Sequence, residues 1–192
     1  MKNIIVLGAS GSLAKHVIAR LRSEPEIYLT LFVRNRSKIR NIDTNGCSVI
    51  EGDVLNHKDL SEAIMGQDIV YGNLAGDLDK MARNIVRAMN ENNVRKLIFI
   101  SSIGIYSEPV PSVIKPYRAA ADVIEASDLE YTILRPTWFT NDNEIDYEIT
   151  EKGQPEKGSV ISRKSIAEFI YEIIKSPEKY KRQSLGINKP NS

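Results

Sequence analysis

Short apolar runs alternate with amphipathic stretches along most of the chain. The runs are rich in β-branched residues and bounded by glycine, proline or polar residues, a pattern typical of strands. Strands are predicted at Asn3–Leu7, Ile27–Val33, Ser48–Glu51, Asp68–Tyr71, Lys96–Ser101 and Tyr131–Leu134. The intervening stretches place apolar residues on one face at helical spacing, which predicts helices. The clearest faces are those of Leu13, Val17, Ile18 and Leu21, of Met81, Ile85, Ala88 and Met89, and of Ile166, Phe169, Ile170, Ile173 and Ile174.

The regular alternation of strand and helix predicts an α/β fold. Right-handed crossovers would give a doubly wound, mostly parallel sheet with helices on both faces. The length of 192 residues indicates a single domain, residues 1–192. The alternation breaks at 141–160, a polar segment with Gly153, Pro155 and Gly158. We interpret this segment as a hairpin or a small C-terminal lid near the substrate cleft.

Composition narrows the classes of partner. The chain has 26 basic and 25 acidic residues, so no bulk field attracts nucleic acid or a membrane surface. Its single cysteine, Cys47, cannot form an internal disulfide, which suits a reducing compartment. No apolar run approaches the roughly 20 residues of a membrane span, and the N-terminus reads as a strand rather than a signal peptide. We therefore expect a soluble, cytoplasmic protein, and no metal site is predicted.

A glycine-rich stretch, "LGASGSLAKH", follows the first strand and opens the first helix. A helix N-terminus offers unpaired N–H groups and a partial positive charge, which together bind phosphate. Gly8 would allow the sharp turn, Gly11 the approach of a pyrophosphate, and Ala14 close packing of helix on strand. Ser10 and Ser12 add hydroxyl donors. A glycine turn needed only for packing is the alternative, but the position after the first strand favours a dinucleotide site.

The end of the second strand indicates which dinucleotide binds. An NAD site usually carries Asp or Glu there to hold the ribose 2′-hydroxyl. Arg34 occupies that place, Arg36 and Lys38 follow it, and Glu26 lies at the wrong end of the strand. A guanidinium attracts a 2′-phosphate and stacks on adenine. An ordinary basic loop is the alternative, but the lack of any acid in "TLFVRNRSKI" favours NADP(H) as the cofactor.

Later strand ends supply further candidates. Asp53 follows the third strand, where it would accept from the adenine amine or cap the next helix. Ala75 and Gly76 follow the fourth strand and would let a ribose pass close to the backbone. Ser101 and Ser102 close the fifth strand at the carboxyl edge, where ligands bind in open α/β sheets.

Several segments together resemble one family over nearly the whole chain. They are "GASGSLAKHV", "LFVRNRSKI", "EGDVLNHKDL", "ARNIVRAMNENNVRKLIFISS", "EYTILRP" and "SRKSIAEFI". They are similar to the atypical short-chain dehydrogenase/reductase group, in particular its NmrA-like and flavin or biliverdin-IXβ reductase-like members. The resemblance implies a Rossmann fold with strand order 3-2-1-4-5-6 and places Ser102 near the nicotinamide. The predicted cofactor set is Gly8, Ser10, Gly11, Ser12, Leu13, Arg34, Asp53, Val54, Ala75, Gly76, Ser101, Pro136 and Trp138.

Two departures from the family pattern limit the chemistry. The wider superfamily uses Tyr-x-x-x-Lys, in which lysine tunes a tyrosine acid/base. Alignment places Val113 and Tyr117 at those two positions, and no lysine lies four residues after Tyr117. Trp138 stands where the biliverdin reductase-like members have histidine, either as a lid over the nicotinamide or as plain packing. The catalytic candidates are Ser102 and Tyr117.

These observations favour an NADPH-dependent oxidoreductase that passes hydride to a planar conjugated acceptor such as a flavin or quinone. Such an acceptor delocalises charge and takes its proton from solvent, so positioning suffices for catalysis. The alternative is an NADP(H)-binding, redox-sensing regulator without turnover, and an epimerase-like enzyme is a weaker third hypothesis. The expected partner is a small-molecule acceptor, with no nucleic acid and no membrane. Self-association, if any, is expected to be a weak homodimer.

Overall fold

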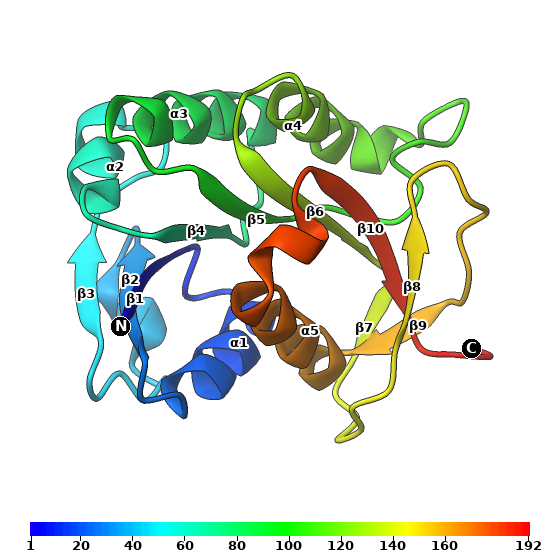
Figure 1. The fold of residues 1–192 in the computed structure, drawn as a ribbon, viewed down its shortest axis with the longest axis horizontal. Coiled ribbons are helices and arrows are strands. Elements are labelled where there is room, and N and C mark those ends of the chain that lie inside the picture. The colour runs from blue at the N-terminus through cyan, green and yellow to red at the C-terminus, as the bar shows by residue number, and fades with distance from the viewer.

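One eight-stranded sheet organises the computed structural model, which describes all residues, 1–192 (Figure 1). Its order is β3-β2-β1-β4-β5-β6-β10-β8. The strands are β1 (Lys2–Leu7), β2 (Ile27–Val33), β3 (Ser48–Glu51), β4 (Ile69–Gly72), β5 (Lys96–Ile100), β6 (Glu130–Pro136), β8 (Glu148–Glu151) and β10 (Gln183–Asn188). All neighbours pair in parallel except β8 and β10. The expected order 3-2-1-4-5-6 is confirmed, and two further strands extend it.

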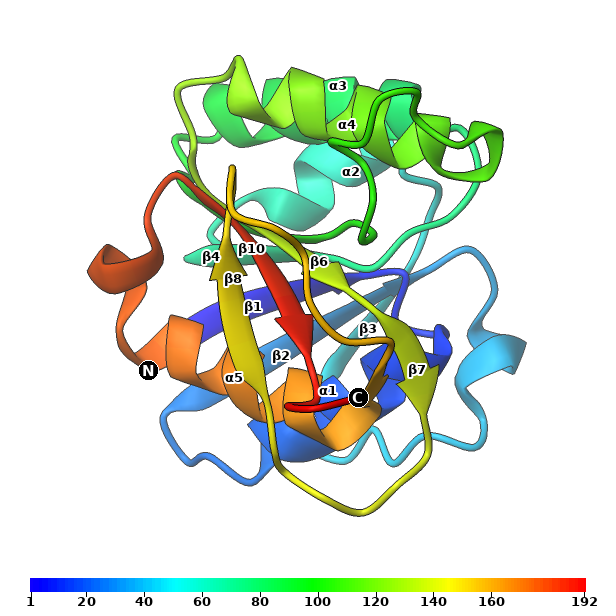
Figure 2. The ribbon, with the colours of Figure 1, turned by 90° about the vertical axis from the view of Figure 1, so that its right-hand side faces the viewer.

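Helices cover both faces of the sheet, as the doubly wound α/β prediction requires. They are α1 (Ser12–Arg22), α2 (His57–Ile64), α3 (Leu78–Glu91), α4 (Lys115–Glu125) and α5 (Arg163–Lys175), with short 3-10 turns η1 (Arg36–Ile39), η2 (Ser112–Ile114) and η3 (Pro177–Tyr180). α2, α3 and α4 lie on one face, and α1 and α5 lie on the other (Figure 2). Each layer encloses its own apolar cluster, so the helical faces read from the sequence are buried.

The segment 141–160 does not form a hairpin. β8 joins the edge of the main sheet antiparallel to β10, whereas β7 (Trp138–Thr140) pairs in parallel with β9 (Val160–Ser162). The physical reason is apolar burial: Ile149 pairs opposite Ile187 and packs against the cluster beneath α5. A polar hairpin closed on itself would leave Ile149 exposed. The hairpin interpretation is therefore wrong, and a lid role for the loop between β8 and β9 stays a prediction.

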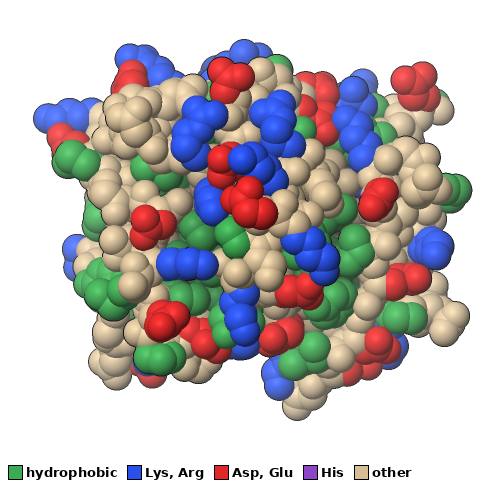
Figure 3. Space-filling model, viewed as in Figure 1, with side chains coloured by type: hydrophobic (Ala, Val, Ile, Leu, Met, Phe, Trp, Pro, Cys, Tyr) green, Lys and Arg blue, Asp and Glu red, His purple; other side chains and the backbone are tan.

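The surface mixes charges of both signs. On the face shown in Figure 3, Lys and Arg side chains lie interspersed with Asp and Glu. This arrangement matches the near balance of 26 basic and 25 acidic residues. No helix of the structure has both the length and the apolarity needed to cross a bilayer.

Candidate functional site

A cavity of about 490 Å³ opens where the carboxyl ends of β1 to β4 meet. The strand order reverses between β1 and β4, the place where ligands bind in doubly wound sheets. The cavity brings together seven of the thirteen residues of the predicted cofactor set, namely Gly8, Ser10, Gly11, Arg34, Asp53, Val54 and Ala75. The other predicted residues do not line it: Ser12, Leu13, Gly76, Ser101, Ser102, Tyr117, Pro136 and Trp138. Leu13 is 1 % exposed, so only its backbone could serve a ligand.

The N-terminus of α1 is open to an anion. Gly11 is the N-cap and supplies no side chain, and the first turn holds no acidic residue. By contrast, the Asn56 side chain caps α2 and the Ser162 side chain caps α5. The unpaired N–H groups and the partial positive charge of α1 are therefore free to receive a phosphate.

The two glycines of this turn pack closely on Asn73, directly after β4. Gly8 has φ +78°, and a Cβ there would lie 2.1 Å from the Asn73 carbonyl oxygen. A Cβ on Gly11 would lie 2.4 Å from Nδ2 of Asn73. Packing of the chain on Asn73 therefore requires glycine at both positions, so the packing interpretation of the stretch holds, whereas phosphate binding there stays a prediction. Asn73 lines the cavity and was missed by the sequence analysis, although a polar residue right after β4 was the available signal.

The basic residues after β2 separate into two roles. Arg34 and Lys38 line the cavity, and neither has an ion pair or a side-chain hydrogen bond within the chain. Arg36 is engaged elsewhere, because its guanidinium donates to the Val49 carbonyl at 2.6 Å. Its backbone N–H donates to the Glu51 carboxylate at 3.0 Å. Two cations without a partner in the chain therefore line the cavity, where an anionic group of a ligand could pair with them.

The loop after β3 is held in a shape that leaves Asp53 facing the cavity. The Asp53 carboxylate accepts from Leu55 N–H at 2.9 Å, and Asn84 of α3 donates to the carbonyls of Val54 and Leu55, each at 3.0 Å. Asn56, and not Asp53, caps α2. The capping alternative for Asp53 is therefore wrong. Its second carboxylate oxygen has no hydrogen-bond donor within the chain, as recognition of an adenine amine would require.

The serines after β5 have different environments. Ser101 is 4 % exposed, and its hydroxyl has no hydrogen-bond partner. A buried orphaned hydroxyl at the ligand-binding edge fits a bound group that supplies the missing partner. The Ser102 hydroxyl donates to the carbonyl of Ile103 at 3.1 Å. Together with the open end of α1 and the unpaired cations, Ser101 makes the residues present compatible with a dinucleotide.

No tyrosine–lysine dyad faces this edge. Tyr117, in the first turn of α4, packs its half-buried ring against the cluster under α3 and α4, and its hydroxyl has no partner. The chain has one Tyr-x-x-x-Lys spacing, Tyr171 and Lys175 in α5. The Tyr171 ring lies 3.6 Å from the Arg20 guanidinium, near the C-terminal end of α1 and far from its N-terminus. Tyr171 is therefore not positioned for acid/base chemistry.

An ion pair links β6 to the segment between β8 and β9, and the loop after β5 binds the same carboxylate. Arg135, near the end of β6, is 2 % exposed and pairs with Glu156. Glu156 also accepts from the Gly104 N–H at 2.7 Å. The guanidinium lies 5.1 Å from the Tyr106 ring centroid. This pair could not be predicted from the sequence, because nothing in the sequence brings residue 156 to residue 135.

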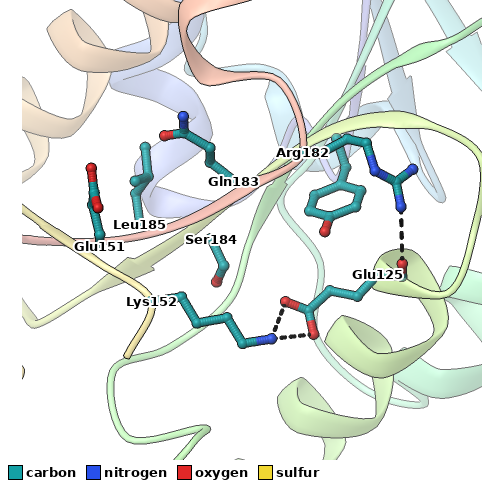
Figure 4. Close-up of a pocket in the computed structure, with 8 residues that line it drawn as sticks. Glu125, Glu151, Lys152, Arg182, Gln183, Ser184 and Leu185 are labelled. Carbon is teal, nitrogen blue, oxygen red and sulfur yellow. Dashed lines mark hydrogen bonds and ion pairs between the residues drawn. The ribbon is translucent and has the colours of Figure 1, made fainter. Parts of the chain in front are cut away.

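A second cavity, of about 360 Å³, lies where β10 begins and α4 ends (Figure 4). Two of its charged side chains, Glu125 and Lys152, pair with each other. Lys152 donates to both carboxylate oxygens of Glu125 at 2.8 Å. Arg182 donates to the carbonyls of Ser127 and Leu129, so it holds the end of α4. This cavity is separate from the carboxyl edge, because its residues lie at the start of β10 and at the end of α4.

Comparison with known proteins agrees with the geometry. A family model described as NAD(P)H-binding matches residues 8–177. Among solved structures, a Rossmann-fold NAD(P)-binding family protein from Shigella flexneri is 48 % identical with a TM-score of 0.92, covering 100 % of this chain and 95 % of that one. A short-chain dehydrogenase/reductase from Veillonella parvula in complex with NADP is 28 % identical with a TM-score of 0.88, covering 99 % and 95 %.

Curated relatives are more distant. An NAD(P)H azoreductase of Xenophilus azovorans is 23 % identical over 98 % of this chain and 68 % of its own length. The chain spans about half the length, 49 %, of an isoflavone reductase homologue of Nicotiana tabacum to which it is 25 % identical over 72 % of this chain.

Proposed function

This chain belongs to the NAD(P)H-binding family of Rossmann-fold oxidoreductases, and we propose that it is an NADPH-dependent reductase of a planar conjugated acceptor. The observation that carries the proposal is the cavity at the carboxyl edge, where the open end of α1 faces two unpaired cations. NADPH carries a pyrophosphate, which would bind at the end of α1, and a 2′-phosphate, which would bind at the two cations. NADH has no 2′-phosphate.

Different residues would bind different parts of NADPH. The first turn of α1 and the hydroxyl of Ser10 would hold the pyrophosphate, and Arg34 with Lys38 would hold the 2′-phosphate. Asp53 would accept from the adenine amine. Ser101 and Ser102, beyond the cavity, would orient the nicotinamide end. When bound, NADPH supplies a hydride to the acceptor.

The acceptor class follows from the absence of a tuned acid. Reduction of a ketone needs a proton donor at the developing alkoxide, and Tyr117 lacks the lysine that would tune it. A quinone, flavin or azo compound spreads the two added electrons over a conjugated system and takes its proton from solvent. Orientation is then the main catalytic contribution of the protein. The relative described as an NAD(P)H azoreductase supports an acceptor of this kind.

Steady-state oxidation of NADPH by the purified protein tests the proposal, with menadione, FMN and the azo dye methyl red as acceptors. Gly11→Val, which fills the space beside the end of α1, serves as the inactive control. We expect acceptor-dependent oxidation that is slower with NADH at equal concentration. Tight NADPH binding without oxidation by any acceptor would refute the reductase and favour a regulator that senses NADP(H).

A further inference from the structure

Trp138 presents a large aromatic surface to solvent. Its side chain is 81 % exposed, whereas most large apolar side chains of the chain are buried. The next residue, Phe139, packs against the cluster beneath α5, so the alternation of β7 directs Trp138 to the opposite face. An indole is stabilised by burial and by contact with other rings, and this one makes no such contact within the chain. Exposure therefore rules out the plain packing role.

The exposed ring stands on a fixed backbone. The Trp138 N–H donates to the Ser159 carbonyl at 3.1 Å, and Trp138 pairs with Val160 in the β7–β9 ladder. The ring is therefore presented by a paired strand and not by a free loop. An aromatic side chain on a fixed backbone has only its own rotamers to lose on binding, which suits a recognition surface.

Trp138 also borders the predicted nicotinamide end of the site. The Ile103 N–H donates to the Pro136 carbonyl at 3.1 Å, which joins the segment after β5 to the end of β6. Ser102 directly precedes Ile103, and Trp138 follows Pro136 by two residues. The two candidates, from distant parts of the sequence, thus lie along the same stretch of the carboxyl edge.

We propose that Trp138 forms the acceptor subsite, on which a flat conjugated molecule stacks while it receives hydride. The inference rests on the proposed reductase function and gives it a specificity determinant. Stacking of two π systems adds to the free energy of apolar burial and requires no charge on the ligand. The subsite would select planar molecules and would contribute little to cofactor affinity, unlike the nicotinamide lid that the sequence suggested.

The single tryptophan of the chain makes the subsite directly observable. FMN or menadione is titrated into protein saturated with NADP⁺, so that no turnover occurs, and Trp138 fluorescence is followed. We expect saturable quenching by at least one of the two.

Steady-state kinetics with the acceptor that binds gives a second test. Trp138→Ala should raise the KM of that acceptor about tenfold and leave the dissociation constant of NADPH unchanged. Trp138→Phe should restore most of the loss. Tyr28→Ala, which removes a partly exposed aromatic side chain at the start of β2, is the matched control and should change neither constant.

The outcomes separate this inference from the proposed function. Quenching by NADP⁺ alone, with no further response to FMN or menadione, would overturn the acceptor subsite and assign Trp138 to the cofactor. So would normal acceptor kinetics in Trp138→Ala while NADPH oxidation proceeds. Saturable quenching by an acceptor without any NADPH oxidation would uphold stacking of a planar ligand on Trp138 and refute the reductase.

Discussion

Replacing Glu156 by alanine should destabilise the protein far more than removing a partner from a surface ion pair. Arg135 is 2 % exposed, so its guanidinium has little access to water of its own when its carboxylate partner is lost. The remaining contacts of Arg135 are weak, with the Thr150 and Ser184 carbonyls at 3.4 and 3.5 Å. The Gly104 N–H would also lose its acceptor.

The magnitude follows from the burial of the two partners. Leaving one charge of a buried pair uncompensated costs about 3–5 kcal/mol. The Glu156 side chain is 23 % exposed, so water replaces part of its role and the expected loss is near the lower end, about 3 kcal/mol. Glu156→Gln keeps a hydrogen-bonding oxygen and should cost less. Arg135→Met combined with Glu156→Gln should cost less than the sum of the single changes, since no buried charge then remains.

Urea unfolding followed by far-UV circular dichroism measures these losses in the free energy of unfolding, provided that the m-value is the same in each variant. Arg83→Ala is the matched control, because the Arg83–Asp79 pair is exposed, and a loss of no more than about 0.5 kcal/mol is expected there. A loss of under about 0.5 kcal/mol for Glu156→Ala, comparable to a surface pair, would show that the pair does not hold the two segments together.

The remaining predictions concern the site and its pH dependence. Arg34→Ala should weaken NADPH binding about ten- to a hundredfold and leave NADH binding nearly unchanged, as calorimetric titration with each cofactor would show. Gly11→Val should abolish dinucleotide binding with an unchanged far-UV spectrum. Tyr117→Phe should lower kcat less than about tenfold, whereas a true general acid contributes about 10²–10⁴-fold. Ser102→Ala should lower it more, because misorientation of the reacting groups is costly. Burial and the neighbouring Arg163, Lys164 and Lys15 lower the pKa of His16 below 6.5, so stability should fall as pH decreases through that value, and less so in His16→Gln.

Each of these predictions would be contradicted by a specific result. Equal dissociation constants for NADPH and NADH would contradict the role of Arg34, and normal cofactor binding by Gly11→Val would make the glycine stretch a packing turn. A thousandfold loss at Tyr117 with intact cofactor affinity would identify an acid-dependent carbonyl reductase. An NMR titration that places the pKa of His16 at or above its ordinary value would contradict the pH argument.

The sequence predicted the elements whose patterns are local. β1 to β6 are short apolar runs, and the helices between them carry continuous apolar faces, so periodicity alone locates them. β7 to β10 were not predicted, because their strand character depends on partners elsewhere in the chain: β10 pairs with β6 and β8, and β7 pairs with β9. The sequence "EITE" of β8 has one strongly apolar residue and becomes a strand only where Ile149 meets Ile187.

The residues of the site also differ in whether a local pattern or a long-range contact places them. Gly8, Arg34 and Asp53 each follow a predicted strand, so the parallel sheet necessarily gathers them at one edge. Asn73 and Glu156 depend on contacts across the fold. Glu156 in particular lies in a polar segment with no periodicity, and only the tertiary structure brings it to Arg135.

Single-turnover oxidation tests the central claim most directly. A complex of the protein with one equivalent of NADPH is mixed anaerobically with menadione, and the absorbances of NADPH and of the quinone are followed together. We predict that one NADPH is consumed for each quinone reduced and that this oxidation is faster than in the absence of protein. At low quinone concentration the oxidation should be slower in the Trp138→Ala variant. NADPH that stays bound and unoxidised in the presence of the quinone would contradict it.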